Sequence, residues 1–363
     1  MKNLVLLIKK LITAKWIFKK PKKFYFLIYD RAGSEIFHSL LKKKKFHILD
    51  VRGESINFYV LLCTICKSGF FKITINYRIN YFRIVNPKFI ITMIDNNLSF
   101  YKFKKIFKKP KYISIQGGRR DNFFLDQCYN YYLKNTERLQ VDIFFVLGPN
   151  EIERLSKYIK AKFYCLGSIK NNHFFFKKKK NNFNNNKKIL FVSKKDNFLL
   201  NFHETRIFNL VYKFCKKNNY QLNLCTRSFL LEEKYYRNKL KGSWNYIPYS
   251  MKSSYNSINS SDLIVYTNST LGLEALVKGK KVVAFPLDFK SFPIAGYNKK
   301  FSKAGPFWKS DCSDQKVFKL LNKVERYSKY HWKLIMKKYV SDVISYNPKN
   351  KIFFKKLKQL QNL

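Results

Sequence analysis

The sequence predicts an α/β protein of two domains, each built around a largely parallel sheet. Short apolar runs alternate with segments of helical periodicity, and this alternation stops once and then starts again. The length of 363 residues fits two domains of ordinary size, and a hydrophobic content of 46% supplies two cores. We therefore expect two Rossmann-like domains whose sheets face a central cleft, where ligands bind beyond the carboxyl ends of the strands.

Six apolar runs in the first half have the length and composition of buried parallel strands. They are rich in β-branched and aromatic residues, and they are apolar throughout rather than alternating. The predicted strands span residues 24–30, 46–51, 89–94, 112–116, 143–147 and 162–166. Helices are predicted at residues 34–43, 55–66, 99–107 and 150–159.

An asparagine- and lysine-rich stretch interrupts the alternation, and its low complexity is typical of a linker. After it, strands are predicted at residues 189–193, 221–226, 245–248, 263–267 and 281–285. Helices are predicted at residues 204–217, 230–240, 253–259, 271–278 and 316–327. The expected organisation is a first domain, a linker, a second domain and C-terminal helices, at residues 1–169, 170–188, 189–329 and 330–363.

The chain is strongly basic, with 73 Lys and Arg against 22 Asp and Glu and a formal charge of +51. Such a charge invites a polyanionic partner, so a nucleic-acid-binding protein is one hypothesis. However, the lysines are scattered through nearly every segment and accompany many Asn, Ile, Phe and Tyr residues, as in a genome rich in A and T. A nucleic-acid footprint should cluster on one face, and the sequence therefore does not favour nucleic acid as a partner.

No apolar run approaches the roughly 18 residues of a membrane-spanning helix. The basic N-terminal segment, residues 1–23, could form an amphipathic helix that touches anionic lipid or an ordinary surface helix. Seven cysteines are an odd number in a long chain, which does not suggest a disulfide framework. We expect a cytoplasmic protein, with peripheral contact at the inner face of the membrane as an open alternative.

The most informative loop follows the fourth strand of the second domain, in the segment DLIVYTNSTLGLEAL. The chain is predicted to turn at Asn268 and to open a helix with Ser269 and Thr270, whose free N–H groups and dipole would favour a phosphate. Gly272 permits close approach, and Glu274 lies one turn into the helix, where its carboxylate could accept from ribose hydroxyls. A plain Asn or Ser cap on a packing helix gives the same pattern.

A second candidate is the segment QGGRR at the end of a first-half strand. Gly117 and Gly118 free the backbone to form an anion-binding concavity. Arg119 and Arg120 can grip phosphate or carboxylate with two parallel hydrogen bonds. A flexible turn with exposed arginines is the alternative interpretation.

Other polar residues follow strands that should end at the same sheet edges. Asp30 and Asp95 follow first-domain strands, and either carboxylate is a candidate general base for an acceptor hydroxyl. Lys194 and Arg227 follow second-domain strands and could neutralise a departing diphosphate. Taken singly, each of these residues is equally a cap or turn residue.

Several chemistries lack their sequence signature. No G-x-x-x-x-G-K-[ST] or G-x-G-x-x-G occurs, which removes the usual phosphate loops of ATPases and dinucleotide enzymes. No D-x-D occurs for a nucleotide-bound metal, and there is no H-E-x-x-H. The sequence predicts neither a metal site nor a bound cofactor.

The segment IVYTNSTLGLEALVKGKKVVAFP, within residues 263–286, resembles the donor-site segment of GT-B glycosyltransferases. More narrowly, the chain resembles bacterial surface carbohydrate biosynthesis proteins, which make lipopolysaccharide or capsule sugars. NPKFIITMIDNNLSFYKFKKIF and YISIQGGRR, at residues 86–107 and 112–120, are similar to the middle segment of that group. Residues 148–168 and 292–308 are similar to it as well.

The resemblance implies a metal-independent GT-B glycosyltransferase that moves a sugar from a nucleotide-diphosphate sugar to a carbohydrate or lipid-linked acceptor. It implies that Ser269 and Thr270 bind the donor diphosphate, that Glu274 binds the ribose or the sugar, and that Arg227 supplies a cation for the leaving group. The usual glycine-rich loop of the first domain is absent, which leaves the acceptor side open. A nucleotide-sugar 2-epimerase and a polyol-phosphate transferase are the alternatives on the same fold.

Overall fold

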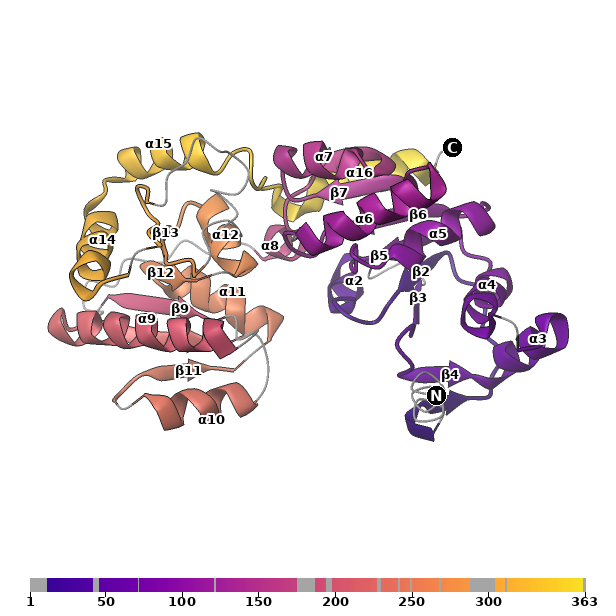
Figure 1. The fold of residues 1–363 in the computed structure, drawn as a ribbon, viewed down its shortest axis with the longest axis horizontal. Coiled ribbons are helices and arrows are strands. Elements are labelled where there is room, and N and C mark those ends of the chain that lie inside the picture. The colour runs from indigo at the N-terminus through magenta and orange to yellow at the C-terminus, as the bar shows by residue number, and fades with distance from the viewer. Residues whose placement is uncertain are drawn as a thin grey trace. The chain divides into compact units, whose positions relative to one another are not determined.

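The computed structural model describes residues 12–41, 46–70, 72–120, 122–174, 187–193, 198–226, 230–240, 242–248, 250–267, 269–287, 304–310 and 312–361. The chain divides into two compact units (Figure 1). The first comprises residues 1–146 and 152–164, and the second comprises residues 147–151 and 165–363. The division after Tyr164 precedes the predicted linker at 170–188, of which residues 175–186 lie outside the described part.

The first unit contains a six-stranded sheet in the order β3-β2-β5-β6-β7-β8. Its strands are β2 (Phe26–Tyr29), β3 (Phe46–Leu49), β5 (Phe89–Thr92), β6 (Lys111–Ile115), β7 (Leu139–Val146) and β8 (Ile159–Cys165). All six were predicted, and the neighbours from β3 to β7 pair in parallel. From β2 the chain adds β3 on one side and β5 on the other, so the strand order reverses between β2 and β5. Parallel sheets bind ligands at this position.

The helices along this part of the chain are α2 (Glu35–Leu40), α3 (Phe58–Ser68), α4 (Ile73–Val85), α5 (Leu98–Ile106), α6 (Asn122–Asn135) and α7 (Pro149–Ser156). The predicted helix at 55–66 begins later, because residues 55–57 form the short strand β4 (Ser55–Asn57). Asn57 caps α3 by accepting a hydrogen bond from Val60 N at 3.1 Å. The strand β4 pairs in parallel with β1 (Lys15–Ile17), so this part of the N-terminal segment is not helical.

The second unit contains a five-stranded sheet in the order β11-β10-β9-β12-β13, with all neighbours parallel. Its strands are β9 (Lys188–Val192), β10 (Gln221–Cys225), β11 (Asn245–Ile247), β12 (Leu263–Tyr266) and β13 (Lys281–Ala284). These strands match the five predicted ones within one residue at each end. The order reverses between β9 and β12, so the carboxyl ends of these two strands mark the expected ligand position.

Helices cover the second sheet and continue to the C-terminus. They are α8 (Ile169–His173), α9 (Phe198–Lys217), α10 (Leu230–Lys239), α11 (Met251–Ser260), α12 (Thr270–Val277), α14 (Asp314–Arg326), α15 (Lys329–Tyr339), the 3-10 turn η1 (Pro348–Asn350) and α16 (Lys351–Gln361). The 3-10 turn that begins at Pro348 separates α15 from α16. A hydrophobic core lies below them, with Phe191, Ile264 and Val283 buried from adjacent strands.

Two glycines let segments distant in the sequence cross closely within the second unit. A Cβ at Gly148 would lie 2.6 Å from the backbone of Val343. Gly167 has φ +76°, and a Cβ there would lie 2.0 Å from the carbonyl oxygen of Ser345. The crossing is fixed by the hydrogen bond from Ser345 N to Leu147 O at 2.7 Å, so a larger residue at either glycine would open it.

Within the described ranges, no single helix is both long and apolar enough to cross a membrane. The pair α3 and α4 passes that test only when taken together, and the two helices are bent by 115° at the break between them. Residues 1–11 of the basic N-terminal segment lie outside the described residues.

Candidate functional site

The predicted donor loop lies at the carboxyl end of β12, beside the point where the sheet order reverses. Ser269 caps α12, and its hydroxyl accepts a hydrogen bond from Leu271 N at 3.3 Å. Ser269 and Thr270 are both half-buried. The first-turn N–H groups of α12 therefore face the carboxyl edge of the sheet, in the strand-to-helix geometry that accommodates a phosphate.

Gly272 is required by packing against Tyr266, the last residue of β12. A Cβ at Gly272 would lie 2.4 Å from the ring of Tyr266, which is fully buried. The glycine thus lets the first turn of α12 sit directly on the end of its own strand. The close approach that the sequence predicted for a ligand is made here by an aromatic ring.

Glu274 lies one turn into α12 and is 6% exposed. Its carboxylate accepts a hydrogen bond from the hydroxyl of Tyr255 on α11 at 2.6 Å. Burial raises the pKa of Glu274 above its ordinary value, while hydrogen bonds from Ser168 and Tyr255 and the charge of Lys278 act in the opposite direction. The carboxylate is held by protein groups in this structure, and its predicted role toward ribose stays a prediction.

Lys278, one turn after Glu274, completes this cluster. Its ammonium donates to the carbonyl oxygen of Phe174 at 2.6 Å and lies 5.3 Å from the ring centroid of Tyr255. Burial lowers the pKa of Lys278 to about 8, against the raising effect of Glu274. The ring of Phe174 stacks on Tyr255 at 4.9 Å, so the group is packed on several sides.

Three predicted donor residues, Lys194, Arg227 and Asn268, lie outside the described residues. The strand ends that precede them are described. β9 ends at Val192, β10 at Cys225 and β12 at Tyr266, so all three loops leave the same edge of the sheet. Their assignment to the donor site stays a prediction.

A buried carboxylate that the sequence analysis missed lies at this edge. Glu204 on α9 is fully buried and accepts hydrogen bonds from the hydroxyls of Ser193 at 2.8 Å, Tyr236 at 3.2 Å and Thr267 at 2.5 Å. Ser193 and Thr267 directly follow β9 and β12. Glu204 therefore ties together the two strand ends between which the sheet order reverses. The presence of polar residues directly after both strands was the available sequence signal.

In the first unit, Asp95 lies in the loop after β5 and is fully buried. One carboxylate oxygen accepts from Gly117 N at 3.0 Å, and the other accepts from Arg120 Nε at 2.6 Å. A second contact joins Arg120 Nη2 to Asp95, so the ion pair is bidentate. Asp95 and the QGGRR segment were predicted separately, and the fold brings them together because they follow adjacent strands. Arg120 here binds the carboxylate of Asp95, a group of the protein itself.

The glycines of this segment have different surroundings. A Cβ at Gly117 would lie 2.7 Å from the carbonyl oxygen of Met93, so the backbone of the loop after β6 presses on the loop after β5. Gly118 and Arg119 are half-buried. Arg154 donates to the carbonyl oxygen of Arg120 at 3.1 Å and fixes the end of the segment. The anion-binding role of the segment stays a prediction.

Asp30, directly after β2, lies at the point where the order of the first sheet reverses. It is buried, has φ 84°, accepts from Ala32 N at 3.0 Å and pairs with Arg52 Nε at 3.0 Å. A crossed pair joins Arg31 to Asp50 at 2.7 Å. Asp50 follows β3 and was not among the predicted residues. Asp tolerates a positive φ better than most residues, and such backbone conformations cluster at functional sites.

Among the residues that the structure describes, no group of three or more His, Cys, Asp or Glu side chains is arranged to hold a metal ion.

The imidazole of His203 contacts the carbonyl oxygen of Phe285 at 2.9 Å, next to the end of β13. Burial lowers the pKa of His203. This histidine was not singled out by its sequence position.

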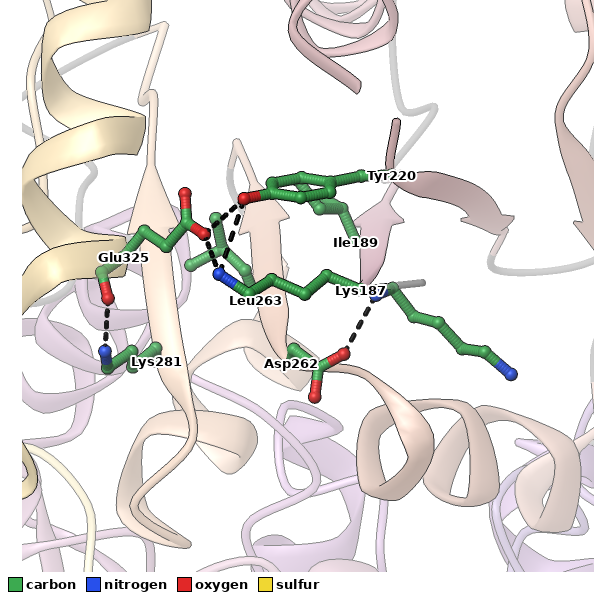
Figure 2. Close-up of a pocket in the computed structure, with 8 residues that line it drawn as sticks. Lys187, Ile189, Tyr220, Asp262, Leu263, Lys281 and Glu325 are labelled. Carbon is green, nitrogen blue, oxygen red and sulfur yellow. Dashed lines mark hydrogen bonds and ion pairs between the residues drawn. The ribbon is translucent and has the colours of Figure 1, made fainter. Parts of the chain in front are cut away.

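A cavity of about 130 Å³ lies at the opposite, amino-terminal edge of the second sheet (Figure 2). Lys187 pairs with the carboxylate of Glu325, which also accepts from Tyr220 at 2.5 Å. The hydrogen bond with Glu325 raises the pKa of Lys187. Lys281 donates to the backbone of Glu325 (Figure 2). These charges pair with one another and lie away from the carboxyl edge, so we assign this cavity a structural role.

Part of the second unit is similar to a known protein family. Residues 194–361 match the model of a family described as "putative O-antigen biosynthesis protein". The match covers α9 to α16, including the β12–α12 segment. No curated protein matches the chain.

Solved structures match across both units. The chain is similar to the UDP-GlcNAc 2-epimerase from Neisseria meningitidis, with a TM-score of 0.58 and 12% identity over 92% of this chain and 99% of that chain. The fold is GT-B-like. The wall teichoic acid polymerase TagF matches with a TM-score of 0.54 and 12% identity over 99% of this chain and 95% of that chain. For S. aureus TarM the TM-score is 0.45 at 13% identity over 80% of this chain, which spans 59% of the TarM chain.

Proposed function

We propose that this protein is a glycosyltransferase that moves a sugar from a nucleotide-diphosphate sugar to an acceptor during assembly of a surface polysaccharide. The observation that carries the proposal is the β12–α12 turn, which lies in the segment that matches the O-antigen family. The epimerase from Neisseria meningitidis is bound to UDP-GlcNAc, and TagF is a wall teichoic acid polymerase. A GT-B-like fold used for nucleotide-activated substrates in cell-surface chemistry supports the same assignment for this chain.

In this proposal, the donor diphosphate lies at the N-terminus of α12. The helix dipole and first-turn N–H groups favour the anion, and the hydroxyls of Ser269 and Thr270 add donors. Lys194 and Arg227 would neutralise the diphosphate as it departs. Glu274 would accept from a ribose or sugar hydroxyl, with Tyr255 beside it as a further polar group.

The first unit would bind the acceptor and supply the general base. Of the two candidates, the contacts favour Asp30 over Asp95. Arg120, the partner of Asp95, is only 17% exposed, whereas Arg52, the partner of Asp30, is 54% exposed and can move away more easily. The acceptor is a carbohydrate or a lipid-linked carbohydrate, and the reaction is expected to proceed without a metal because the sequence has no D-x-D. The proposed location is the cytoplasm, with peripheral contact at the inner face of the membrane.

A nucleotide-sugar 2-epimerase is the second candidate, because UDP-GlcNAc 2-epimerases match the chain with TM-scores of 0.54 to 0.59 over nearly their whole length. A polyol-phosphate transferase is a third, on the likeness to TagF. The basic composition keeps nucleic-acid binding as an alternative of another class.

One experiment separates the glycosyltransferase from the epimerase and from a nucleic-acid-binding protein. The purified protein is screened by thermal shift against nucleoside diphosphates and their sugars, and binding should add about 2.7 kcal/mol of stability when ligand is at 100 times its Kd. The stabilising sugar nucleotide is then incubated with and without acceptor extract in EDTA. Acceptor-dependent release of nucleoside diphosphate supports the transferase, and epimerisation without acceptor overturns it. Steeply salt-dependent RNA binding without nucleotide-sugar binding would favour the nucleic-acid alternative.

A further inference from the structure

The first unit carries a small appendage outside its six-stranded sheet. It consists of the two-stranded sheet of β1 and β4 followed by α3 and α4 (Figure 1). Asn57, at the end of β4, donates to the carbonyl oxygen of Lys19 at 2.8 Å and holds the chain after β1 in place. The hydroxyl of Tyr77 on α4 accepts a hydrogen bond from Asn57 N at 2.9 Å and ties this helix to the junction. The appendage is therefore an ordered structure with its own hydrogen bonds.

Large apolar side chains of this appendage are exposed to an unusual degree. Phe18 is 70% exposed, Phe70 at the α3–α4 connection is 76% exposed, and Leu62 on α3 is 45% exposed. Phe58 is also exposed, and its ring lies 5.5 Å from that of Phe18. Phe58 and Leu62 are four residues apart on α3 and share one helix face. Phe18, Phe58 and Leu62 thus form one exposed apolar group, and such groups mark interaction sites, whereas Phe70 is a further exposed apolar side chain beyond the end of α3.

The same region is basic and has no acidic residue on the N-terminal side. The first 29 residues contain no Asp or Glu. The lysines around Phe18 that the structure describes are all exposed: Lys15, Lys19, Lys20, Lys22 and Lys23. Lys20 lies 5.2 Å from the ring centroid of Tyr59 on α3, which places this charge beside the exposed apolar face. Lys67 and Lys72 flank Phe70 and are exposed as well.

We propose that this apolar–basic patch, made of Phe18, Phe58, Leu62 and Phe70 with the surrounding lysines, docks the protein onto a membrane surface that contains anionic lipid. Lysines near such a surface are attracted by its negative potential, while aromatic and aliphatic side chains enter the headgroup boundary. The aliphatic side chains distinguish lipid from nucleic acid as the occupant, because Leu62 and the exposed Ile75 offer no ring on which a base could stack.

The geometry assigns the appendage to the interface rather than to the bilayer interior. A spanning helix needs about 20 residues, whereas α3 has 11 and α4 has 13. The two helices are bent by 115° at the break between them and do not form one straight span. This inference extends the proposed function, since lipid-linked acceptors are presented at such a surface, and it rests on that function only for its biological setting.

The test measures binding of the full chain to sedimenting vesicles, without any sugar nucleotide, so that it is independent of the proposed reaction. Vesicles of phosphatidylcholine alone are compared with vesicles that also contain phosphatidylglycerol. We expect binding only to the second kind, and strong salt should weaken it. Lys19→Glu with Lys20→Glu should weaken binding at least about twenty-five-fold, since each lost lysine contributes about fivefold and each added carboxylate is repelled. Lys216→Glu with Lys217→Glu, exposed on α9, changes the net charge equally and should bind as the wild type does.

The apolar part is tested by Phe18→Ser with Phe70→Ser, matched to Phe123→Ser with Leu133→Ser on α6, where both side chains are also exposed. Only the first pair should reduce binding, by at least tenfold. Hydrogen exchange of the wild type, which needs no variant, should show protection of α3 and of the α3–α4 connection when anionic vesicles are added. Equal binding by both variant pairs, equal binding to both vesicle types, or protection elsewhere would overturn the proposal. RNA binding that removes the protein from vesicles and is unaffected by the Phe changes would overturn it too.

Discussion

The hydroxyl of Tyr255 donates a 2.6 Å hydrogen bond to the carboxylate of Glu274, and this contact joins α11 to the helix that the sequence assigned to the donor site. The carboxylate is thus oriented before any ligand binds. A ribose hydroxyl that used Glu274 would meet an acceptor already fixed in position, which reduces the ordering cost of binding. The same contact makes the pair experimentally separable, because either residue can be changed while the other remains.

We predict that Glu274→Gln separates folding from donor binding. Burial raises the pKa of Glu274, so the protonated form is favoured by the folded state. The stability that this group contributes is complete below its unfolded pKa and is lost as the pH rises through the folded value. The neutral Gln escapes that loss, and urea unfolding at pH 7 should show the variant to be as stable as the wild type or more stable. Donor binding should weaken by about 1.5–3 kcal/mol, as for a lost hydrogen bond to a charged group.

Tyr255→Phe is the matched control, because it keeps the carboxylate and removes one of its donors. It should destabilise the protein by about 1 kcal/mol and change donor binding less than Glu274→Gln does. Unchanged turnover in Glu274→Gln would show that α12 is only a well-capped packing helix.

Ser269→Ala should have two small and separable effects. The cap of α12 is lost, which costs about 1 kcal/mol of stability. The backbone N–H groups of the first turn survive, so donor affinity should fall only modestly. Isothermal titration with the stabilising nucleoside diphosphate measures the second effect. Loss of all binding in a folded variant would contradict a site built mainly from backbone groups.

The sheets could be predicted from the sequence because buried parallel strands are short apolar runs, as β2, β5, β9 and β12 show. The strands β1 (KWI) and β4 (SIN) were not predicted, because neither is a continuous apolar run. The helix α4 was missed because it interleaves Asn, Arg and Tyr with its apolar residues, although Ile79, Phe82 and Val85 are buried.

The candidate site was predictable in position but not in pairing. Strand ends located Asp30, Asp95 and the Ser269–Thr270 turn, because parallel strands share one carboxyl edge. Nothing in the spacing showed that Arg120 would bind Asp95 or that Gly272 would make room for Tyr266, since these are tertiary contacts. Glu204 lies within a long helix, and only the folded chain brings it to Ser193 and Thr267.

Lys278 should give a pH-dependent contribution to stability. Burial lowers its pKa to about 8, so the folded state favours the neutral amine. The stability of a group with a depressed pKa is present above its unfolded value of 10.5 and is lost as the pH falls through about 8. As the pH rises from about 8 to 10.5, the wild type should therefore gain stability relative to Lys278→Met. The gain should be on the order of 1 kcal/mol once solvent screening is allowed for. Urea unfolding of both proteins across this range measures the difference, and a flat difference would contradict the assignment.

The Asp95–Arg120 pair should be structural. Asp95→Asn leaves the Arg120 charge largely buried without its carboxylate, which should cost about 3–5 kcal/mol. Asp95→Leu combined with Arg120→Met removes both charges. The double variant should lose less stability than Asp95→Leu alone or Arg120→Met alone. A double-mutant cycle by chemical unfolding measures the coupling. If Asp95→Asn instead keeps full stability and abolishes turnover, Asp95 is the general base and the preference for Asp30 is wrong.

The last prediction concerns Glu204, which accepts from hydroxyls at the ends of both central strands of the second sheet. Thr267→Val removes the hydroxyl that donates to Glu204, so one buried carboxylate oxygen loses this hydrogen bond. The free energy of unfolding should fall by about 1–3 kcal/mol. Because Asn268 and Ser269 follow Thr267 directly, the change should also weaken nucleotide binding. Thr74→Val, at an exposed position of α4, is the matched control and should change neither property. A Thr267→Val protein that loses stability yet binds nucleotide with wild-type affinity would show that Glu204 supports the sheet alone. Weakened binding at full stability would show that it positions the loop.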